Sequence, residues 1–470
     1  MEKVKHQWLA LVAIGLFTIM ANLDSSIVNI ALPILSKDFD IPTSAASYTV
    51  IIYMVVLSGL LIVGGRLGDM ISKTRIFKIG MYVFTVGSIL ASINFGFKFL
   101  LFARVVQAIG AAATLSNSYG LISKIFTKET VGKAMGFNTM FISAGFIAGP
   151  AIGGMLLQHF IWNSIFMINI PLGIIAIIMA QLYLPNENAG KVSTNFDWLG
   201  SILLFAIISL LIVGLETGQN LGFANLNVLI LFGILVVIAI IFGLIENHHS
   251  EPVLDFKLFG DKKFTLALMA GVMVMMVNSF FDIVFPFYLQ NILHWSVGAA
   301  GLMMISFPVI MAISAPFGGS LGDKYGRTSI VISGAIFLLV SQLLYITFGF
   351  GTSIVMMILA TAVNGIGAGL FVSNNNTLVM ESVKPHQLGI AGAVQSLLTN
   401  IGQVLGIVFA NLILYTTMSK DAGRKISTIP TNHPGLFVNG MHVTFIATSL
   451  FMVLCLLIYA VRGRIKHLKA

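Results

Sequence analysis

The sequence predicts an all-α integral membrane protein with fourteen transmembrane helices, arranged as two six-helix halves and an inserted pair of helices. Two observations lead to this prediction. Of the 470 residues, 57% are hydrophobic and only 9% are charged, whereas about a quarter of the residues in a typical soluble domain are charged. In addition, a short glycine-rich segment that ends in aspartate occurs twice along the chain.

Long apolar stretches recur from one end of the chain to the other, separated by mostly short polar segments. A helix that crosses the hydrocarbon core of a bilayer needs about 20 mainly apolar residues. We therefore expect each stretch to form one membrane-spanning helix. The stretches cover approximately residues 8–33, 48–67, 77–95, 98–121, 134–157, 163–184, 198–216, 225–245, 264–289, 299–320, 328–349, 353–379, 389–415 and 441–461.

The net charge of +9 reflects membrane topology. Nucleic-acid binding would require a basic patch on a soluble face, and the basic residues lie instead in the segments between the apolar stretches. With the N-terminus placed inside, nineteen of the 26 lysines and arginines fall on the cytoplasmic side and five fall outside. This distribution obeys the positive-inside rule. It predicts cytoplasmic N and C termini, and no nucleic acid as a partner. Because nothing in the sequence marks an organelle, a bacterial inner membrane is the simplest location.

The glycine-rich segments indicate an internal repeat. Gly64–Asp69 follows the second apolar stretch, and Gly318–Asp323 follows the tenth. Parallel repeats of this kind build transporters from two halves, with the substrate site between them near the bilayer midplane. The predicted division is an N-terminal half (residues 1–190), the inserted helices with their linkers (191–262) and a C-terminal half (263–470).

Four motifs resemble those of a known family. The Gly64–Asp69 segment resembles the hallmark loop of the major facilitator superfamily. Leu23–Pro33, Arg104–Gly110 and Gly145–Gly154 are similar to motifs of its 14-helix drug:proton antiporters, which include exporters of quaternary ammonium compounds. The resemblance implies the major facilitator fold and proton-coupled multidrug efflux by alternating access, in which lipophilic, often cationic drugs leave in exchange for protons.

The expected partners are small-molecule drugs, protons and the lipid bilayer. Enzymatic motifs are absent from the sequence, so we expect no enzyme activity, no cofactor and no metal site. Without a phosphate-binding loop, the energy source should be an ion gradient. Export of an endogenous lipid, sugar or metabolite stays open, as does a non-transporting receptor. The chain is expected to act as a monomer, and an envelope adaptor protein stays open.

Three charged side chains stand out because they lie deep within predicted membrane helices, namely Asp24, Asp282 and Arg104. A charge in the membrane is costly and by default indicates a functional site. Burial disfavours an ionised carboxylate and a nearby cation favours it, which suits competition between a proton and a cationic drug. We predict that both acids line one central cavity, that Asp282 binds substrate and proton, and that Arg104 pairs with Asp24. The resemblance implies a proton relay for Arg104, and structural hydrogen bonding is the alternative for all three.

The family resemblance implies a conformational latch at the repeated segments. In the resembling family, charged residues in these cytoplasmic turns hold one conformation and release it during transport. Catalytic chemistry is not expected there, and glycine permits the close approach of neighbouring helices. The latch residues are Gly65, Asp69, Lys73, Arg75, Asp323 and Arg327.

The antiporter motif contains Gly145, Gly149, Pro150, Gly153 and Gly154. Small residues on one helix face allow close helix packing in membranes, and proline bends a helix. We predict that this face packs against the other half and opposes proton leak. Ordinary helix packing is the alternative explanation.

Polar, aromatic and flexible side chains in the predicted helices are candidates for the substrate pocket. Three consecutive amides, Asn374–Asn376, cannot all face lipid without cost, so at least one is expected to face the cavity. Core or lipid-facing packing is the alternative for any single residue. The candidates, besides Asp282, are Asn138, Phe281, Phe285, Tyr288, Asn374, Asn375, Gln395, Asn400 and Gln403.

Overall fold

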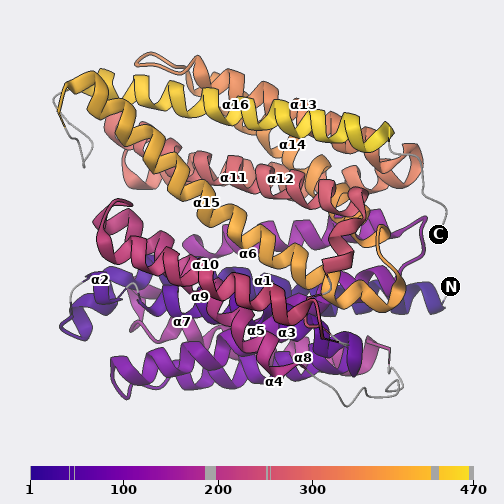
Figure 1. Ribbon diagram of the computed structural model, residues 1–470. Helices are drawn as coiled ribbons and strands as arrows, with labels where there is room; N and C mark the ends of the chain where they lie inside the picture. Colours follow the sequence, from indigo (N-terminus) through magenta and orange to yellow (C-terminus); the bar gives the residue numbers. More distant parts are fainter. Residues whose placement is uncertain are drawn as a thin grey trace. The chain divides into compact units, whose positions relative to one another are not determined.

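The computed structural model describes residues 2–41, 43–46, 48–185, 197–249, 252–254, 256–424 and 433–464 (Figure 1). Within these residues every regular element is helical, and no strand is present. Fourteen helical segments are long and apolar enough to cross a membrane. The predicted fold class is therefore confirmed.

The helices up to the end of the inserted pair follow the predicted stretches, with the sixth span divided into a short helix and a longer one. A four-residue helix, α2, lies outside the predicted spans. The elements are α1 (Glu2–Asp38), α2 (Thr43–Ala46), α3 (Tyr48–Met70), α4 (Lys73–Ala91), α5 (Phe97–Ile125), α6 (Val131–His159), α7 (Ser164–Met167), α8 (Asn169–Tyr183), α9 (Trp198–Leu221) and α10 (Leu226–Glu246).

The remaining elements begin with a short 3-10 helix in the linker that follows α10. They are η1 (Phe256–Gly260), α11 (Lys262–Phe287), η2 (Tyr288–Ile292), α12 (Val297–Tyr325), α13 (Arg327–Ile346), α14 (Ile354–Glu381), η3 (Pro385–Gln387), α15 (Leu388–Ala422) and α16 (Pro434–Arg464). The gap between the predicted spans 389–415 and 441–461 is too long, because α15 continues to Ala422 and α16 starts at Pro434, a residue well suited to the first helical position.

The chain divides into two compact units. The first unit contains Met1–Thr127, Phe141–Gly260 and Val383–Leu397, and the second contains Lys128–Met140, Asp261–Ser382 and Leu398–Ala470. The inserted helices α9 and α10 belong to the first unit, where α9 packs on α3. The start of α6 is assigned to the second unit and the start of α15 to the first.

The two units repeat the same pattern of helix packing. In the first unit, α4 packs along α5, α3 packs on α5, and α1 packs on α8. In the second unit, α13 packs along α14, α12 packs on α14, and α11 packs on α16 (Figure 1). The repeat inferred from two short sequence segments therefore extends through whole helices.

One asparagine in each unit stabilises the same contact between two helices. In the first unit, Asn117 Nδ2 of α5 donates to the Gly64 carbonyl oxygen of α3 at 3.0 Å. In the second unit, Asn374 Nδ2 of α14 donates to the Gly318 carbonyl oxygen of α12 at 2.9 Å. Glycine allows these backbones to approach closely, and the amide then joins the two helices by a hydrogen bond of the kind that links membrane helices.

Candidate functional site

Asp24 of α1 and Arg104 of α5 form an ion pair inside the first unit. Arg104 Nη1 lies 2.5 Å from Asp24 Oδ2, and the residues are 1% and 0% exposed. This is the pairing expected from the sequence. An unpaired guanidinium within the membrane would be severely disfavoured, so the pair explains how Arg104 is accommodated.

Arg104 has further partners on its own helix and on α3. Its Nη1 donates to Gln107 Oε1 at 2.8 Å, and its Nε donates to the Thr49 carbonyl oxygen at 3.1 Å. The guanidinium carbon lies 4.1 Å from the centre of the Tyr53 ring, a cation–π contact. Arg104 is thus bonded both to a carboxylate and to a carbonyl, the two alternatives that the sequence left open.

Asp24 accepts hydrogen bonds from amides as well as from Arg104. Asn169 Nδ2 of α8 donates to Asp24 Oδ1 at 2.7 Å, and Gln107 Nε2 lies 3.4 Å from the same oxygen. Gln107 also donates to Ser88 Oγ of α4 at 2.8 Å. Together with Thr49 and Tyr53 of α3, five helices therefore contribute to one buried polar cluster. Sequence reasoning missed Asn169, Ser88 and Tyr53; a lone amide at the start of the apolar helix α8 was the available signal for Asn169.

Asp282 of α11 has a different environment, because its side chain is exposed. Met269 and Phe287 are exposed apolar residues of the same helix, and at 100° per residue they lie on one line along it. Asp282 lies about 140° around the helix from that line. It therefore faces away from the apolar outer side of α11, on the side that carries Asn278 and Ser279.

The prediction that Asp24 and Asp282 line one cavity fails for Asp24. Asp24 is 0% exposed because Arg104 and Asn169 enclose its carboxylate, so it faces no open space. Only Asp282 is accessible. The two acids differ in environment, one being sealed among polar side chains and the other open.

The aromatic candidates of α11 lie in the core of the second unit. Phe281, Phe285 and Tyr288 are 1%, 0% and 0% exposed. The ring centres of Phe281 and Phe285 are 4.7 Å apart, that of Tyr345 lies 5.4 Å from Phe281, and Tyr288 OH donates to the Gly349 carbonyl oxygen at 2.6 Å. The prediction that these rings line an open pocket is wrong, because they occupy the core-facing side of α11.

The asparagines of α14 are also buried, so the expectation that at least one faces a cavity is wrong. Asn374, Asn375 and Asn376 are 0%, 1% and 3% exposed. Asn374 Nδ2 donates a hydrogen bond to the Gly318 carbonyl oxygen of α12, and Asn375 Oδ1 accepts one from Tyr459 OH of α16. Their amides join helices of the second unit.

The other candidates divide by accessibility. Asn138 and Gln395 are 2% and 4% exposed, and thus buried. Asn400 and Gln403 of α15 are half-buried. The accessible members of the predicted substrate set are therefore Asp282, Asn400 and Gln403.

Asp69 binds the start of another helix within the first unit. Its Oδ1 and Oδ2 accept hydrogen bonds from the backbone N–H groups of Gly389 and Ile390, at 2.9 and 2.8 Å. Lys73 Nζ lies 2.5 Å from Asp69 Oδ1. A carboxylate at a helix N-terminus satisfies free N–H groups and interacts favourably with the helix dipole. Gly65 lies directly against Gly389, where a side chain would collide.

Arg75, the other predicted latch residue of this segment, contributes to a helix start. Its backbone N–H donates to Ser72 Oγ at 3.1 Å, which caps α4. A latch role for its side chain stays a prediction.

Asp323 makes the equivalent contact in the second unit. Its Oδ1 and Oδ2 accept the backbone N–H groups of Gly132 and Lys133 at 3.0 and 2.9 Å. Arg327 Nη2 lies 2.8 Å from Asp323 Oδ1, and Nη1 lies 3.1 Å from Glu381 Oε1. Each repeat segment therefore ends in an aspartate that holds the first turn of a long helix, α15 in one unit and α6 in the other.

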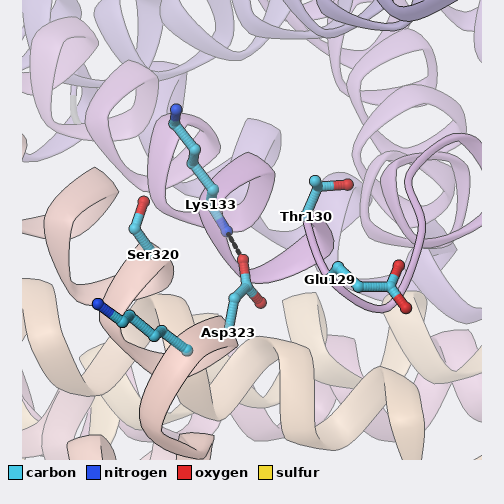
Figure 2. A pocket seen from close by; sticks show the side chains of 6 residues that line it. Glu129, Thr130, Lys133, Ser320 and Asp323 are labelled. Atoms are coloured by element: carbon cyan, nitrogen blue, oxygen red, sulfur yellow. Dashed lines mark hydrogen bonds between the residues drawn. The ribbon is translucent and has the colours of Figure 1, made fainter.

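A cavity of about 200 Å³ lies beside Asp323. Figure 2 shows the Asp323 carboxylate directed at the Lys133 backbone nitrogen. Two acidic and two basic side chains surround the space, so it has no net preference for anions or cations. We assign it to the latch region. The lining residues are Glu129, Thr130, Lys133, Ser320, Asp323 and Lys324.

Three glycines of the antiporter motif pack against α1 in the first unit. A side chain at Gly149 would collide with Ser26, and one at Gly153 would lie 2.6 Å from Ile27. Gly145 likewise lies against the α1 backbone. This corrects the prediction that the face packs on the other half, since α1 belongs to the same unit.

The rest of the motif differs from that face. Gly154 has open space where a side chain would lie, and the side chain of Pro150 is outside the described part of the chain. The helix contact thus depends on glycines spaced four residues apart, which occupy one face of a helix.

A multi-helix membrane protein with a repeated six-helix pattern, buried charges and repeated aspartate caps is a transporter of the two-half type. The Major Facilitator Superfamily sequence profile matches residues 14–252 and 267–469. The chain belongs to this superfamily, and it is a multi-pass membrane transporter.

Several relatives are bacterial. The riboflavin transporter RibZ of Clostridioides difficile is 31% identical over 407 residues, which is 86% of this chain and 88% of RibZ. The multidrug resistance protein Stp of Mycobacterium tuberculosis is 27% identical, covering 88% of this chain and 77% of Stp. The tetracenomycin C resistance and export protein of Streptomyces glaucescens is 26% identical, covering 87% and 76%.

Two solved structures share the fold. The human organic anion transporter MFSD10 superposes with a TM-score of 0.64 at 13% identity, covering 97% of this chain and 98% of MFSD10. The proton:xylose symporter XylE gives a TM-score of 0.63 at 15% identity, covering 97% and 95%. At these identities the likeness shows the fold alone.

Proposed function

We propose that this protein exports lipophilic cations from the bacterial cytoplasm across the inner membrane in exchange for protons, with both termini in the cytoplasm. The observation that supports this most is the difference in environment between two acids. Asp24 is buried in an ion pair with Arg104, and Asp282 is accessible on α11. An antiporter can couple its two fluxes through one group that senses the proton and another that binds the charged substrate, and these environments suit that division.

Asp24 and Arg104 form the proton-coupling element of the proposal. A buried ion pair is held by its own attraction and by the hydrogen bonds that satisfy it. Protonation of Asp24 would remove its charge and release Arg104 Nη1 from the 2.5 Å contact. Arg104 would keep its hydrogen bonds to Gln107 and Thr49. Protonation of Asp24 would therefore break only the ion pair, and the buried guanidinium would still have hydrogen-bond partners.

Asp282 provides the attraction for a cation. Without a basic partner in its immediate stretch of α11, an accessible carboxylate binds either a proton or a cationic substrate, and each excludes the other. Asn400 and Gln403, both half-buried, supply hydrogen-bonding groups that tolerate different substrates. A neutral substrate would gain nothing from the Asp282 charge.

The helix caps at Asp69 and Asp323 serve as the latch. Each carboxylate spans two backbone N–H groups of another helix, so these contacts form or break as a unit. Alternating access requires such bistable contacts. The protein would act as a monomer, or together with an envelope adaptor protein.

Riboflavin transport is the second candidate. The RibZ relative, at 31% identity, is more similar to this chain than the drug-resistance relatives named above. A flavin is a planar, largely neutral ring system, so its transport would not depend on the charge of Asp282.

The test uses purified protein in liposomes with an imposed pH gradient. Uptake of ethidium and of riboflavin is measured for the wild type and for Asp282→Asn. The proposal predicts gradient-driven ethidium movement that Asp282→Asn abolishes. Riboflavin movement that persists in Asp282→Asn, with no ethidium movement in the wild type, would establish the second candidate instead.

A further inference from the structure

A second pair of acids lies at one end of the inserted helices. Asp197 precedes α9 and caps it, and Glu246 is the last residue of α10. They are 4% and 2% exposed. Acidic side chains are almost never this buried unless they are paired. Both carboxyl groups therefore need partners inside the protein.

One oxygen of each carboxyl group binds the backbone. Asp197 Oδ1 accepts the Gly200 N–H at 2.7 Å, and Glu246 Oε1 accepts the Leu254 N–H at 2.6 Å. Leu254 belongs to the linker that leads from α10 to α11. Val253 and Leu254 are 1% and 8% exposed, so Glu246 fixes a buried part of this linker on the end of α10.

The other two oxygens lie on the same side of Gly200. Asp197 Oδ2 and Glu246 Oε2 are buried and accept no hydrogen bond from a donor group within the described chain. Both lie against Gly200: a side chain there would lie 2.6 Å from Glu246 Oε2 and would also collide with Asp197 Oδ2. The two oxygens thus lie beside the same point, and glycine at position 200 leaves the room for both carboxyl groups.

Two ionised carboxylates in contact at a buried site repel each other strongly, and a single shared proton removes the repulsion. We propose that Asp197 and Glu246 bind one proton between them, and that this proton holds Val253 and Leu254 on the end of α10. The proton would join Oδ2 of Asp197 to Oε2 of Glu246, the two oxygens that otherwise accept nothing. Its loss would separate the carboxyl groups and release the linker.

Within the described residues, no donor on the packed elements forms a hydrogen bond with Asp197 Oδ2 or Glu246 Oε2. On the linker, Lys257 is exposed. At the end of α10, His248 is exposed and its Nδ1 lies 2.8 Å from the Leu244 carbonyl oxygen, and His249 is half-buried.

The helix α3, which packs on α9, carries Arg66 and Asp69, and Asp69 is paired with Lys73. Glu251 and Asp255 of the linker lie outside the described residues.

The inference concerns how the linker is held, and it is independent of what the protein transports. The linker joins the inserted pair to the second repeat, and the Phe256 ring packs on Phe242 of α10 with ring centres 6.0 Å apart. Docking of this segment would respond to the pH on its own side of the membrane.

The experiment measures how fast a buried linker cysteine reacts with a maleimide as pH changes. The native cysteine is replaced (Cys455→Ser), and Val253→Cys reports linker release. Lys257→Cys, at an exposed linker position, serves as the reference. The ratio of the two rates cancels the effect of pH on thiol reactivity. The ratio should rise at least about tenfold between pH 6 and pH 9, as the shared proton is lost.

Two variants separate the proposal from a purely structural contact. Glu246→Gln supplies a permanent donor to Asp197 and still accepts from Leu254, so its ratio should stay low at every pH. Glu246→Ala removes the linker contact and should give a high ratio at every pH. Size-exclusion profiles identify any variant that fails to fold. If Glu246→Gln fails to fold, Asp197→Asn, which keeps a good helix cap, should instead give a rate ratio that stays low at every pH.

A wild-type ratio that stays low from pH 6 to pH 9 would overturn the proposal. So would a Glu246→Gln or Asp197→Asn ratio that rises as steeply as the wild type, or a Glu246→Ala variant as protected as the wild type.

Discussion

Asp24 of α1 and Val277 of α11 occupy equivalent positions in the internal repeat. Gly149 packs on Ser26 of α1, and Gly406 packs on Ser279 of α11; Asp24 and Val277 each precede that serine by two residues. Val277 is 0% exposed. The first repeat thus buries an acid where the second buries an apolar side chain.

Asp282 is therefore not the repeat counterpart of Asp24. It lies five residues beyond Val277, which corresponds to about 140° of rotation around the helix. This rotation turns its side chain out of the core of the second unit. The asymmetry supports different roles for the two acids, and the predictions below depend on it.

Replacing Asp24 should destabilise the protein much more than replacing Asp282. Asp24→Asn leaves Arg104 buried beside a neutral partner, and breaking a buried ion pair in this way costs about 3–5 kcal/mol. Asp282→Asn changes an exposed side chain and should alter stability by no more than about 0.5 kcal/mol. Thermal unfolding in detergent, compared between the two variants, measures the difference. Equal unfolding temperatures would mean that the Asp24–Arg104 pair is not a structural element.

The glycines of the antiporter motif should differ in their tolerance of a methyl group. Gly149→Ala places the methyl group against Ser26 of α1, and overpacking of this kind costs about 1–3 kcal/mol. Gly154→Ala is the matched control, because open space surrounds that position; it should be neutral or stabilise the helix by up to about 1 kcal/mol. Unfolding temperatures of the two variants test this, and a destabilised Gly154→Ala with a normal Gly149→Ala would refute the packing described.

Removing the Asp69 carboxylate should loosen the start of α15. Asp69→Ala deprives the Gly389 and Ile390 N–H groups of their acceptor, and loss of a helix cap costs about 0.5–2 kcal/mol. Amide hydrogen exchange at these two residues should accelerate about 2- to 30-fold. Asp38→Ala, at an exposed position of α1, should leave it unchanged. Unaltered exchange in Asp69→Ala would show that the cap does not hold the helix.

Asn374 and Gln403 should respond in opposite ways. Asn374→Ala removes the amide that joins α14 to α12, and loss of a buried hydrogen-bonding partner costs about 1–3 kcal/mol. Gln403→Ala, at a half-buried position of α15, should leave stability unchanged and alter the relative transport of different substrates. Unfolding temperature and a substrate panel are measured for both. A stable Asn374→Ala variant with an altered substrate preference would show instead that Asn374 contributes to the substrate pocket.

The sequence predicts the fold and the central ion pair because both follow from the cost of placing polar groups in lipid. Fourteen apolar stretches leave few alternatives to helices, and Arg104 needs an acid, of which Asp24 is one of few within the spans. The repeated Gly–Asp segments predict two halves, and the packing of α4 on α5 and of α13 on α14 agrees with them.

The pocket residues were harder to predict because residue type does not reveal the direction of a side chain. Phe281 and Asp282 are neighbours in sequence, yet one is buried and the other exposed. Aromatic rings suit a drug pocket and a helix core equally well, and Asn374 serves as well between helices as it would in a cavity. Asn169 was missed because its function depends on α8 passing beside Asp24, a contact 145 residues away in sequence.

The most direct test of the proposed division between the acids is proton movement induced by substrate. Inverted vesicles with an acid interior carry the wild type, Asp24→Asn or Asp282→Asn, and ethidium or a zwitterionic fluoroquinolone is added. The account predicts that both compounds release protons through the wild type and that neither does through Asp24→Asn. Through Asp282→Asn, only the fluoroquinolone should do so. Proton release through a folded and inserted Asp24→Asn at the wild-type level would contradict the assignment of proton coupling to the Asp24–Arg104 pair.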